Sequence, residues 1–292
     1  MEDRVEFFMY RATVHPHPKE PLFASKEPKP EILRATIMEA ATATSSRGGR
    51  WHVGNVAPVG TGALSFRLGR LRNTSISQLN SRGDFIDADV PEAPNSFAVV
   101  DIPNEIVAIA RNTSLAPSPG TLGRCLALVL TETRAAKQRS VMVEVAPIKN
   151  PVNFLQDLRN AFAVSKLWVV TKRPNPFDAE RMWVQPMSRI TEELSAESAK
   201  TTWTGPALQA SKPEITDIIN STAANGGDAG ATVRDTKKSD PRRIKLRTNL
   251  ASFSLTVEAD GGLFRAAETV LVGLRDVYRR IRHGDETEDE RD

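Results

Sequence analysis

The sequence predicts an α+β protein with mixed sheets and with helices packed on one face of them, and three observations support this class. Segments with the alternating apolar pattern of strands are interleaved with amphipathic helical segments along all 292 residues. Several neighbouring strand segments are joined by short turns, which indicates hairpins. Neither the GxGxxG loop nor the GxxxxGKS/T loop of nucleotide-binding folds is present. The strand–helix–strand order of both halves is also compatible with two packed ferredoxin-like units.

The first half has the predicted order β-α-β-β-β-β-α. Residues 5–14 ("VEFFMYRATV") alternate and are rich in aromatic side chains, which indicates a buried strand. Residues 30–44 show helical spacing after a proline suited to the first turn. A hairpin around "VGTG", a loop over 80–95 and two strands around "IPNE" follow. A second helix is predicted over 121–137, with Thr121 as its N-cap.

The second half alternates strands and helices more regularly. The predicted strands are 140–148, 166–174, 200–205, 230–235, 242–247 and 251–259. The predicted helices are 150–164, 179–199, 212–227 and 262–284, the second of them broken at Pro186. The last two strands are expected to form a hairpin, and the closing helix carries one clear apolar stripe.

The domain organisation that we expect is an N-terminal α+β unit over 1–138, a C-terminal α+β unit over 139–284 and an acidic tail over 285–292. The tail holds six acidic residues and one arginine, so its net charge is −5. Because the whole chain has a net charge of +3, residues 1–284 carry +8. One cysteine, Cys125, excludes an intramolecular disulfide. No apolar run is long enough to span a membrane and the first residues do not resemble a signal peptide, so a cytoplasmic protein is expected.

Few residues suggest catalysis. The best enzymatic candidate is a divalent-metal nuclease that uses Glu132 and Glu144 with Lys149, because carboxylates and a lysine support phosphodiester cleavage. Five residues separate Glu144 from Lys149 where two are usual, and Glu144 is equally suited to the solvent side of a strand. His15 and His17 lack further ligands nearby, and no metal or cofactor is expected. A binding protein is therefore favoured over an enzyme.

Basic residues form three groups, which suggests contact with a nucleic-acid backbone. The segment "RDTKKSDPRRIKLR" (234–247) has seven basic and two acidic residues in fourteen positions. On a strand, Arg243, Lys245 and Arg247 alternate onto one face opposite Ile244 and Leu246, about 7 Å apart. The predicted nucleic-acid-binding residues are Lys237, Lys238, Arg242, Arg243, Lys245, Arg247, Arg275, Arg279, Arg282, Arg70, Arg72 and Trp51. The last helix contributes its arginines from one face.

Two observations weigh against this interpretation. Half-buried strands and amphipathic helices always need a polar face. An arginine near a helix C-terminus also interacts favourably with the helix dipole. Aromatic side chains that could stack on bases are few: Trp168, Trp183 and Trp203 lie in apolar contexts and are predicted to be core. Trp51, in a glycine-rich basic setting, is the candidate for base stacking.

One segment resembles a known group. The succession "VEVAPIKNPVNFLQDLRNAFAVSKLWVVTKRPNPFD", within residues 140–178, is similar to segments of uncharacterised bacterial proteins associated with phage-defence islands. The turn "KRPNP" after a strand carries the similarity, which implies a bacterial defence or mobile-element context and no site residue.

These observations favour a non-catalytic component of such a system that binds DNA or RNA without sequence readout. The alternative is a protein-interaction subunit whose basic face binds an acidic partner. That partner could be the acidic tail of a second copy in a homodimer. The nuclease is the third hypothesis.

Overall fold

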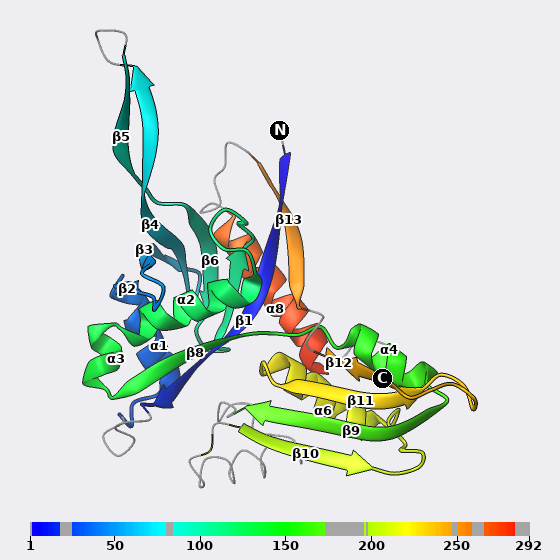
Figure 1. The fold of residues 1–292 in the computed structure, drawn as a ribbon. Coiled ribbons are helices and arrows are strands. Elements are labelled where there is room, and N and C mark those ends of the chain that lie inside the picture. The colour runs from blue at the N-terminus through cyan, green and yellow to red at the C-terminus, as the bar shows by residue number, and fades with distance from the viewer. Residues whose placement is uncertain are drawn as a thin grey trace. The chain divides into compact units, whose positions relative to one another are not determined.

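The computed structural model describes residues 2–17, 25–79, 84–172, 196, 198–246, 250–258 and 266–283 (Figure 1). The fold is α+β, as the sequence predicts: helices accompany a nine-stranded and a four-stranded sheet. Each strand pair whose register is described is antiparallel. None of the described helices is both long enough and apolar enough to cross a bilayer.

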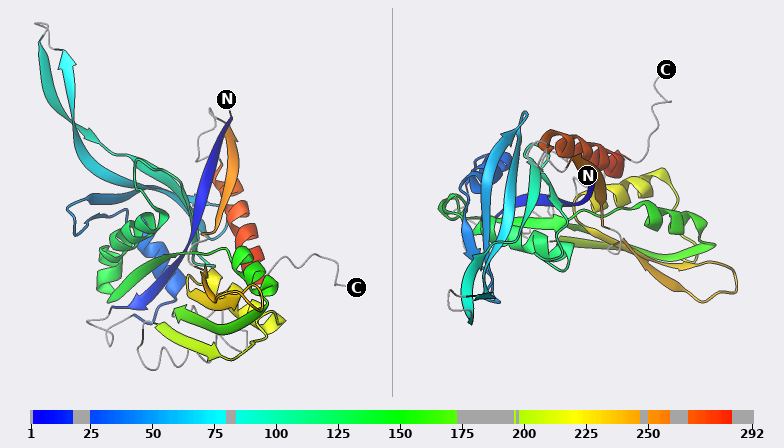
Figure 2. Two further views of the ribbon diagram at one scale, coloured as in Figure 1. Left: turned by 45° about the vertical axis from the view of Figure 1, so that its right-hand side comes forward. Right: turned by 90° about the horizontal axis from the view of Figure 1, so that it is seen from above.

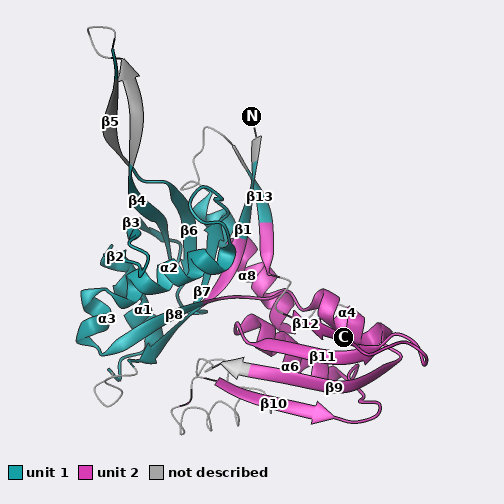
Figure 3. Ribbon diagram, in the orientation of Figure 1, with its two compact units in different colours: residues 1–7, 12–145, 254–271 teal, residues 8–11, 146–253, 272–292 magenta. Residues whose placement is uncertain are grey.

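The chain divides into two compact units (Figure 3). Unit 1 consists of residues 1–7, 12–145 and 254–271, and unit 2 of residues 8–11, 146–253 and 272–292. Strand β1 (Glu2–Pro16), strand β8 (Val141–Pro147), strand β13 (Ser252–Glu258) and helix α8 (Ala267–His283) contribute to both. The sequence-based boundary was placed between residues 138 and 139, whereas the units separate at Val145 and Ala146.

Unit 1 is built on the larger sheet, whose strands follow the order β13-β1-β7-β6-β4-β3-β2, with β5 paired to β4 and β8 to β1. Its further strands are β2 (Thr42–Thr44), β3 (Arg50–Val59), β4 (Ala63–Leu79), β5 (Phe85–Glu92), β6 (Asn95–Asp101) and β7 (Ile106–Ala110). Its helices are α1 (Lys29–Met38), α2 (Pro119–Thr131) and α3 (Arg134–Gln138). Helices α1 and α2 both pack against β3.

Three predicted elements of unit 1 differ from the structure. The first helix ends at Met38, Ala40 takes a left-handed φ of 52°, and the following residues form β2. The predicted helix 121–137 is two helices, because the Thr133 hydroxyl caps α3 by accepting from the Ala136 N–H at 3.1 Å. The loop predicted over 80–95 contains strand β5, whose pairing with β4 compensates for a composition unfavourable to strands.

Unit 2 contains the four-stranded sheet, in the order β10-β9-β11-β12 (Figure 2). Its strands are β9 (Ala163–Lys172), β10 (Ser198–Thr204), β11 (Asp228–Arg234) and β12 (Arg242–Lys245). Its helices include α4 (Val152–Asn160) and α6 (Pro213–Ala224). Helix α6 packs against β9 and β11, and α4 packs against β12. One face of the sheet is therefore covered by helices.

One expectation for this half was wrong. Strands β12 and β13 do not form a hairpin: β12 pairs with β11, and β13 lies beside β1 in the larger sheet. Strand β9 lies between β10 and β11 and is antiparallel to both, so the two strands that α6 connects run parallel to each other, as in the split β-α-β unit of ferredoxin-like folds. The helix predicted over 179–199 lies mostly outside the described residues, and its last residues begin β10.

Candidate nucleic-acid interface

The candidate site is the face of the four-stranded sheet opposite its buried side. Residues directly opposite each other in paired strands point to the same face. One row across the sheet is Thr204, Lys166, Thr232 and Arg243, and the next is Thr202, Trp168, Gly230 and Lys245. A third row holds Lys200, Val170 and Asp228. Lys166, Trp168, Lys200, Arg243 and Lys245 therefore share one face, which we call the cationic face.

The burial pattern assigns the two faces independently of the register. Leu167, Val169, Ala231, Val233 and Ile244, which occupy the alternate positions, are all 8% exposed or less. By contrast, the four basic residues of the cationic face are exposed and Trp168 is half-buried. The alternation of apolar and basic residues thus directs one set into the core beneath α6 and the other set outwards.

The cationic face carries a marked excess of positive charge. Among the described residues of its four strands, Asp228 is the one acidic side chain on this side, and its Oδ1 accepts the backbone N–H of Ala229 at 3.0 Å. Arg234, exposed at the end of β11, adds one more cation one row further along. The strand spacing of about 4.8 Å puts Lys166 and Arg243, two strands apart, about 10 Å from each other.

Trp168 occupies the middle of this face, where Gly230 of the neighbouring strand leaves room for it. A Cβ at position 230 would lie only 2.4 Å from Cζ2 and 2.5 Å from Cε2 of the indole, so the ring edge fills the space above Gly230. The ammonium group of Lys200 lies over the indole, 5.1 Å from the ring centroid. The face thus combines an aromatic ring with surrounding cations.

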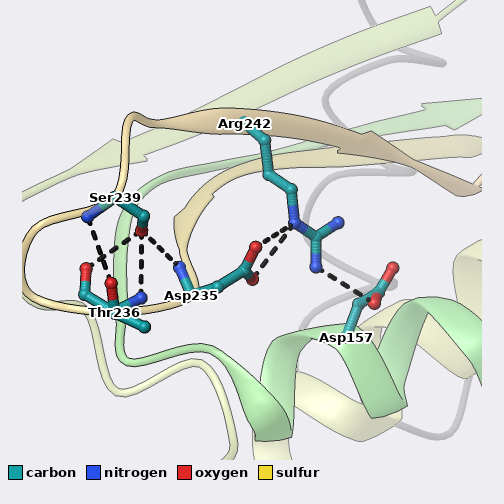
Figure 4. A network of polar contacts seen from close by, with 5 residues as sticks. All are labelled: Asp157, Asp235, Thr236, Ser239 and Arg242. Atoms are coloured by element: carbon teal, nitrogen blue, oxygen red, sulfur yellow. Dashed lines mark hydrogen bonds and ion pairs between the residues drawn. The ribbon is translucent and has the colours of Figure 1, made fainter.

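The turn from β11 to β12 fixes the register of the basic strand (Figure 4). The Ser239 hydroxyl accepts the backbone N–H groups of Asp235 at 3.1 Å and Thr236 at 3.0 Å, and it donates to the carbonyl oxygen of Thr236 at 3.0 Å. The Thr236 hydroxyl accepts the N–H of Ser239 at 3.1 Å. These local bonds are typical of Ser/Thr turns and need no partner from elsewhere in the chain.

Arg242 serves this turn and not the cationic face. It pairs with Val233 and so points to the opposite side of the sheet. Its Nε donates to Asp235 at 2.8 Å and its Nη2 to Asp157 of α4 at 3.3 Å. The hydrogen bond from Arg242 lowers the pKa of the Asp235 carboxyl, and the same bond raises the pKa of Arg242. The arginine therefore ties β12 to the turn and to α4.

The other residues of the segment 234–247 that were predicted to bind nucleic acid lie in the turn, on β12 or outside the described residues. Lys237 and Lys238 are exposed in the turn and lie on no strand. The alternation of Arg243 and Lys245 onto one face, opposite buried Ile244 and Leu246, is what the sequence predicts. Arg247 lies outside the described residues.

Helix α8 does not present its predicted arginines as one uniformly exposed row. Arg279 is exposed and lies 3.8 Å from Asp276, whereas Arg275 and Arg282 are half-buried. An ion pair between exposed side chains three residues apart on one helix contributes little to stability.

Two of the three residues of unit 1 that were predicted to bind nucleic acid, Arg72 and Trp51, have partners or burial within the fold that account for them. Arg72 makes two hydrogen bonds to Glu92, at 2.8 and 2.9 Å, which raise its pKa and neutralise its charge locally. Arg70 is exposed on the same strand. Trp51 is only 4% exposed, so the prediction that its ring can stack on a base does not fit this structure. Its strand packs against α1 and α2, and burial of this large ring follows.

The three catalytic candidates have other partners. Glu132 pairs with Lys137 at 2.7 Å, and Glu144 lies 3.7 Å from His15. The ammonium of Lys149 donates to the carbonyl oxygens of Gly226, at 3.3 Å, and of Gly227, just beyond the end of α6. No group of three or more His, Cys, Asp or Glu side chains in the described part of the chain could hold a metal ion. The hypothesis of a metal nuclease gains no support from this geometry.

Sequence reasoning missed Lys166, Trp168 and Lys200. The alternation in "SKLWVV" and "SAKTTWT" already puts Lys166 with Trp168, and Lys200 with Thr202, on the polar side of their strands. An apolar neighbourhood nevertheless favoured a core assignment for Trp168. The pairing of β9 with both β10 and β11 was needed to show that these residues meet Arg243 and Lys245.

Comparison with known proteins leaves the site to be interpreted from its own chemistry. No protein-family model matches this chain, and no curated protein sequence matches it either.

Proposed function

We propose that this protein binds nucleic acid through the cationic face of unit 2, without catalysis and without reading base sequence. The observation that supports the proposal most directly is the row-by-row register that puts Lys166, Lys200, Arg243 and Lys245 on one side of one sheet. A cluster of lysine and arginine on one face is the electrostatic feature by which proteins bind a phosphate backbone. Side chains aimed at phosphates position a strand but carry no sequence information.

The charges of Lys166 and Arg243 on this face are available for an anionic ligand. Within the described part of the chain, neither Lys166 nor Arg243 has an ion-pair partner. Two carboxylates close to β12, those of Asp235 and Asp157, both bind Arg242 on the other side of the sheet. A solvated polar face needs no such segregation of its acidic groups.

The wider context is a separate part of the proposal. A role in a bacterial defence or mobile-element system rests on the resemblance of residues 140–178 alone, and binding by the cationic face does not depend on it.

The test is fluorescence-anisotropy titration of labelled, generic single-stranded and double-stranded DNA and RNA at low and physiological salt. The informative variant is Arg243→Glu/Lys245→Glu. The matched control is Arg159→Glu/Lys212→Glu, which makes the same charge change at two exposed positions of unit 2 outside the sheet.

We expect wild type and control to bind with a salt dependence that four phosphate contacts produce, a slope of log K against log salt of about −3 to −4. The Arg243→Glu/Lys245→Glu variant should bind far more weakly, with a slope reduced by about 2. Equal affinities for the two double variants would place the contact elsewhere. Absence of binding at low salt would overturn the proposal and favour an acidic protein partner.

A further inference from the structure

We infer that the ligand of the cationic face is a single-stranded nucleic acid and that one of its bases stacks on Trp168. This inference rests on the proposed function and makes it more specific. It depends on where Trp168 lies, since a purely phosphate-binding surface has no use for an indole at its centre.

The position of Trp168 is set by its neighbours across the sheet. It is in register with Thr202 on one side and Gly230 on the other, so a small side chain and a missing one flank the ring. The indole edge occupies the volume that a side chain at position 230 would fill. The ring is therefore supported by the backbone of β11 while it stays half-buried and not enclosed.

Lys200 shows that a ring face of Trp168 is accessible to a cationic group. Its ammonium lies 5.1 Å from the ring centroid, and the rest of this side chain is exposed. A cation over an exposed indole is held weakly, whereas a stacked base gains both contact area and desolvation. A base can thus take the place of the ammonium, and Lys200 can then turn to the adjacent phosphate.

The arrangement favours a single strand over a duplex. In a duplex the flat faces of the bases are stacked on one another, and only the backbone and the base edges are accessible to a protein. A single strand offers both the base faces and the phosphates. Lys166 and Arg243 lie in the row on one side of Trp168 and Lys200 lies in the row on the other side, where the phosphates that flank a stacked base need counter-charges.

The experiment compares three probes of equal phosphate number: an oligothymidylate, a base-free deoxyribose-phosphate oligomer and a duplex. Each is titrated by anisotropy against wild type, Trp168→Leu, Trp168→Phe and, as a control, Trp203→Phe. Trp203 lies on β10 at a position that faces the opposite side of the sheet. Circular dichroism and thermal unfolding confirm that each variant is folded before binding is compared.

We expect the oligothymidylate to bind wild type more tightly than the base-free oligomer does. Trp168→Leu should weaken oligothymidylate binding by about 5- to 150-fold, the range for one lost base stack. The same change should leave the base-free oligomer unaffected, and Trp168→Phe should recover part of the loss. Trp203→Phe should bind as wild type does.

A second readout is intrinsic fluorescence in a variant whose remaining tryptophan is Trp168. Stacking predicts quenching by the oligothymidylate and none by the base-free oligomer. If the two single-stranded probes bind equally and Trp168→Leu has no effect, the inference is wrong while the proposed function stands. If none of the probes binds at low salt, the proposed function itself fails.

Discussion

At the residue scale, the absence of a side chain at Gly230 determines where the indole of Trp168 lies. Every atom beyond the backbone at position 230 would enter the space of the indole, because Cζ2, Cε2 and Nε1 all lie within 2.8 Å of the place for a Cβ. The glycine is not needed for an unusual backbone conformation, since only Gly48, Gly60, Gly62 and Gly226 have positive φ among the described glycines. Its role is to leave room.

Substitution of Gly230 by alanine should therefore destabilise unit 2 through the indole. We expect the free energy of unfolding to fall by about 1–3 kcal/mol, the usual cost of overpacking, in denaturant titrations. In a Trp168→Leu background the same substitution should be neutral or slightly stabilising, because the clash is gone and alanine loses less chain entropy than glycine. Equal effects in the two backgrounds would show that the ring does not occupy this space.

Cys125 is a second residue whose surroundings fix its chemistry. It lies in α2 with 9% of its surface exposed, and burial raises the pKa of its thiol to about 11 against the opposing effect of Arg124 and Arg70. Because the neutral thiol is favoured in the folded state, its contribution to stability is present below the unfolded pKa of about 8.5 and is lost as the pH rises through 11.

The difference in unfolding free energy between wild type and Cys125→Ala should accordingly shrink between about pH 8.5 and pH 11. Urea titrations at a series of pH values measure it. Tyr10, whose pKa burial also raises, is present in both proteins, so its effect cancels in the comparison. A difference that stays constant across this range would mean that the thiol ionises in the folded protein as readily as in the unfolded one.

At the scale of elements, the β11–β12 hairpin shows how a short strand can be given a fixed register. Strand β12 covers Arg242–Lys245 and pairs only with β11 among the described strands. The turn bonds of Thr236 and Ser239 shape one end, and Arg242 connects the hairpin to Asp157 of α4. A one-residue slip would bury Arg243 and Lys245 and expose Ile244, so the register is strongly specified.

Loss of the Arg242 guanidinium should raise the pKa of Asp235 back towards its ordinary value. The carboxylate is favoured in the folded state, so its contribution to stability is present above the unfolded pKa of about 3.9 and is lost as the pH falls through the lower folded pKa. Carboxyl chemical shifts followed by NMR in wild type and Arg242→Gln measure the change. An identical titration of Asp235 in both proteins would contradict the contact.

At the scale of the whole molecule, charge is unevenly distributed along the chain. The last eight residues carry −5 and the rest +8, from a total of +3. Net positive charge raises the encounter rate with polyanions, and attached acidic residues compete with them for basic surfaces.

Removal of residues 285–292 should strengthen binding of single-stranded DNA at low salt and should matter less as salt screens the tail. Anisotropy titrations at several salt concentrations test this, with a control in which the six acids are replaced by their amides at constant length. Because amide replacement removes charge and not chain, it should reproduce the truncation. If affinity at low salt is the same with and without the tail, its charge plays no part in binding.

The sequence alone determined the features that depend on local pattern. Alternation in "RRIKLR" correctly separated Arg243 and Lys245 from Ile244 and Leu246, and the amphipathic stripe located most of α8. Hydrophobic periodicity also predicted the α+β class, because strand and helix periods differ and short turns join neighbouring strands.

The tertiary structure decided what depends on pairing between distant segments. Strand β12 pairs with β11 and not with β13, and β9 joins β10 to β11 across gaps in the sequence that carry no local signal. Trp51, which lies in a polar stretch, is buried, whereas Trp168, in an apolar stretch, is half-exposed beside Gly230 and Lys200. The burial of a side chain and the residues that it contacts depend on which strands become neighbours. Strand pairing is a property of the whole chain.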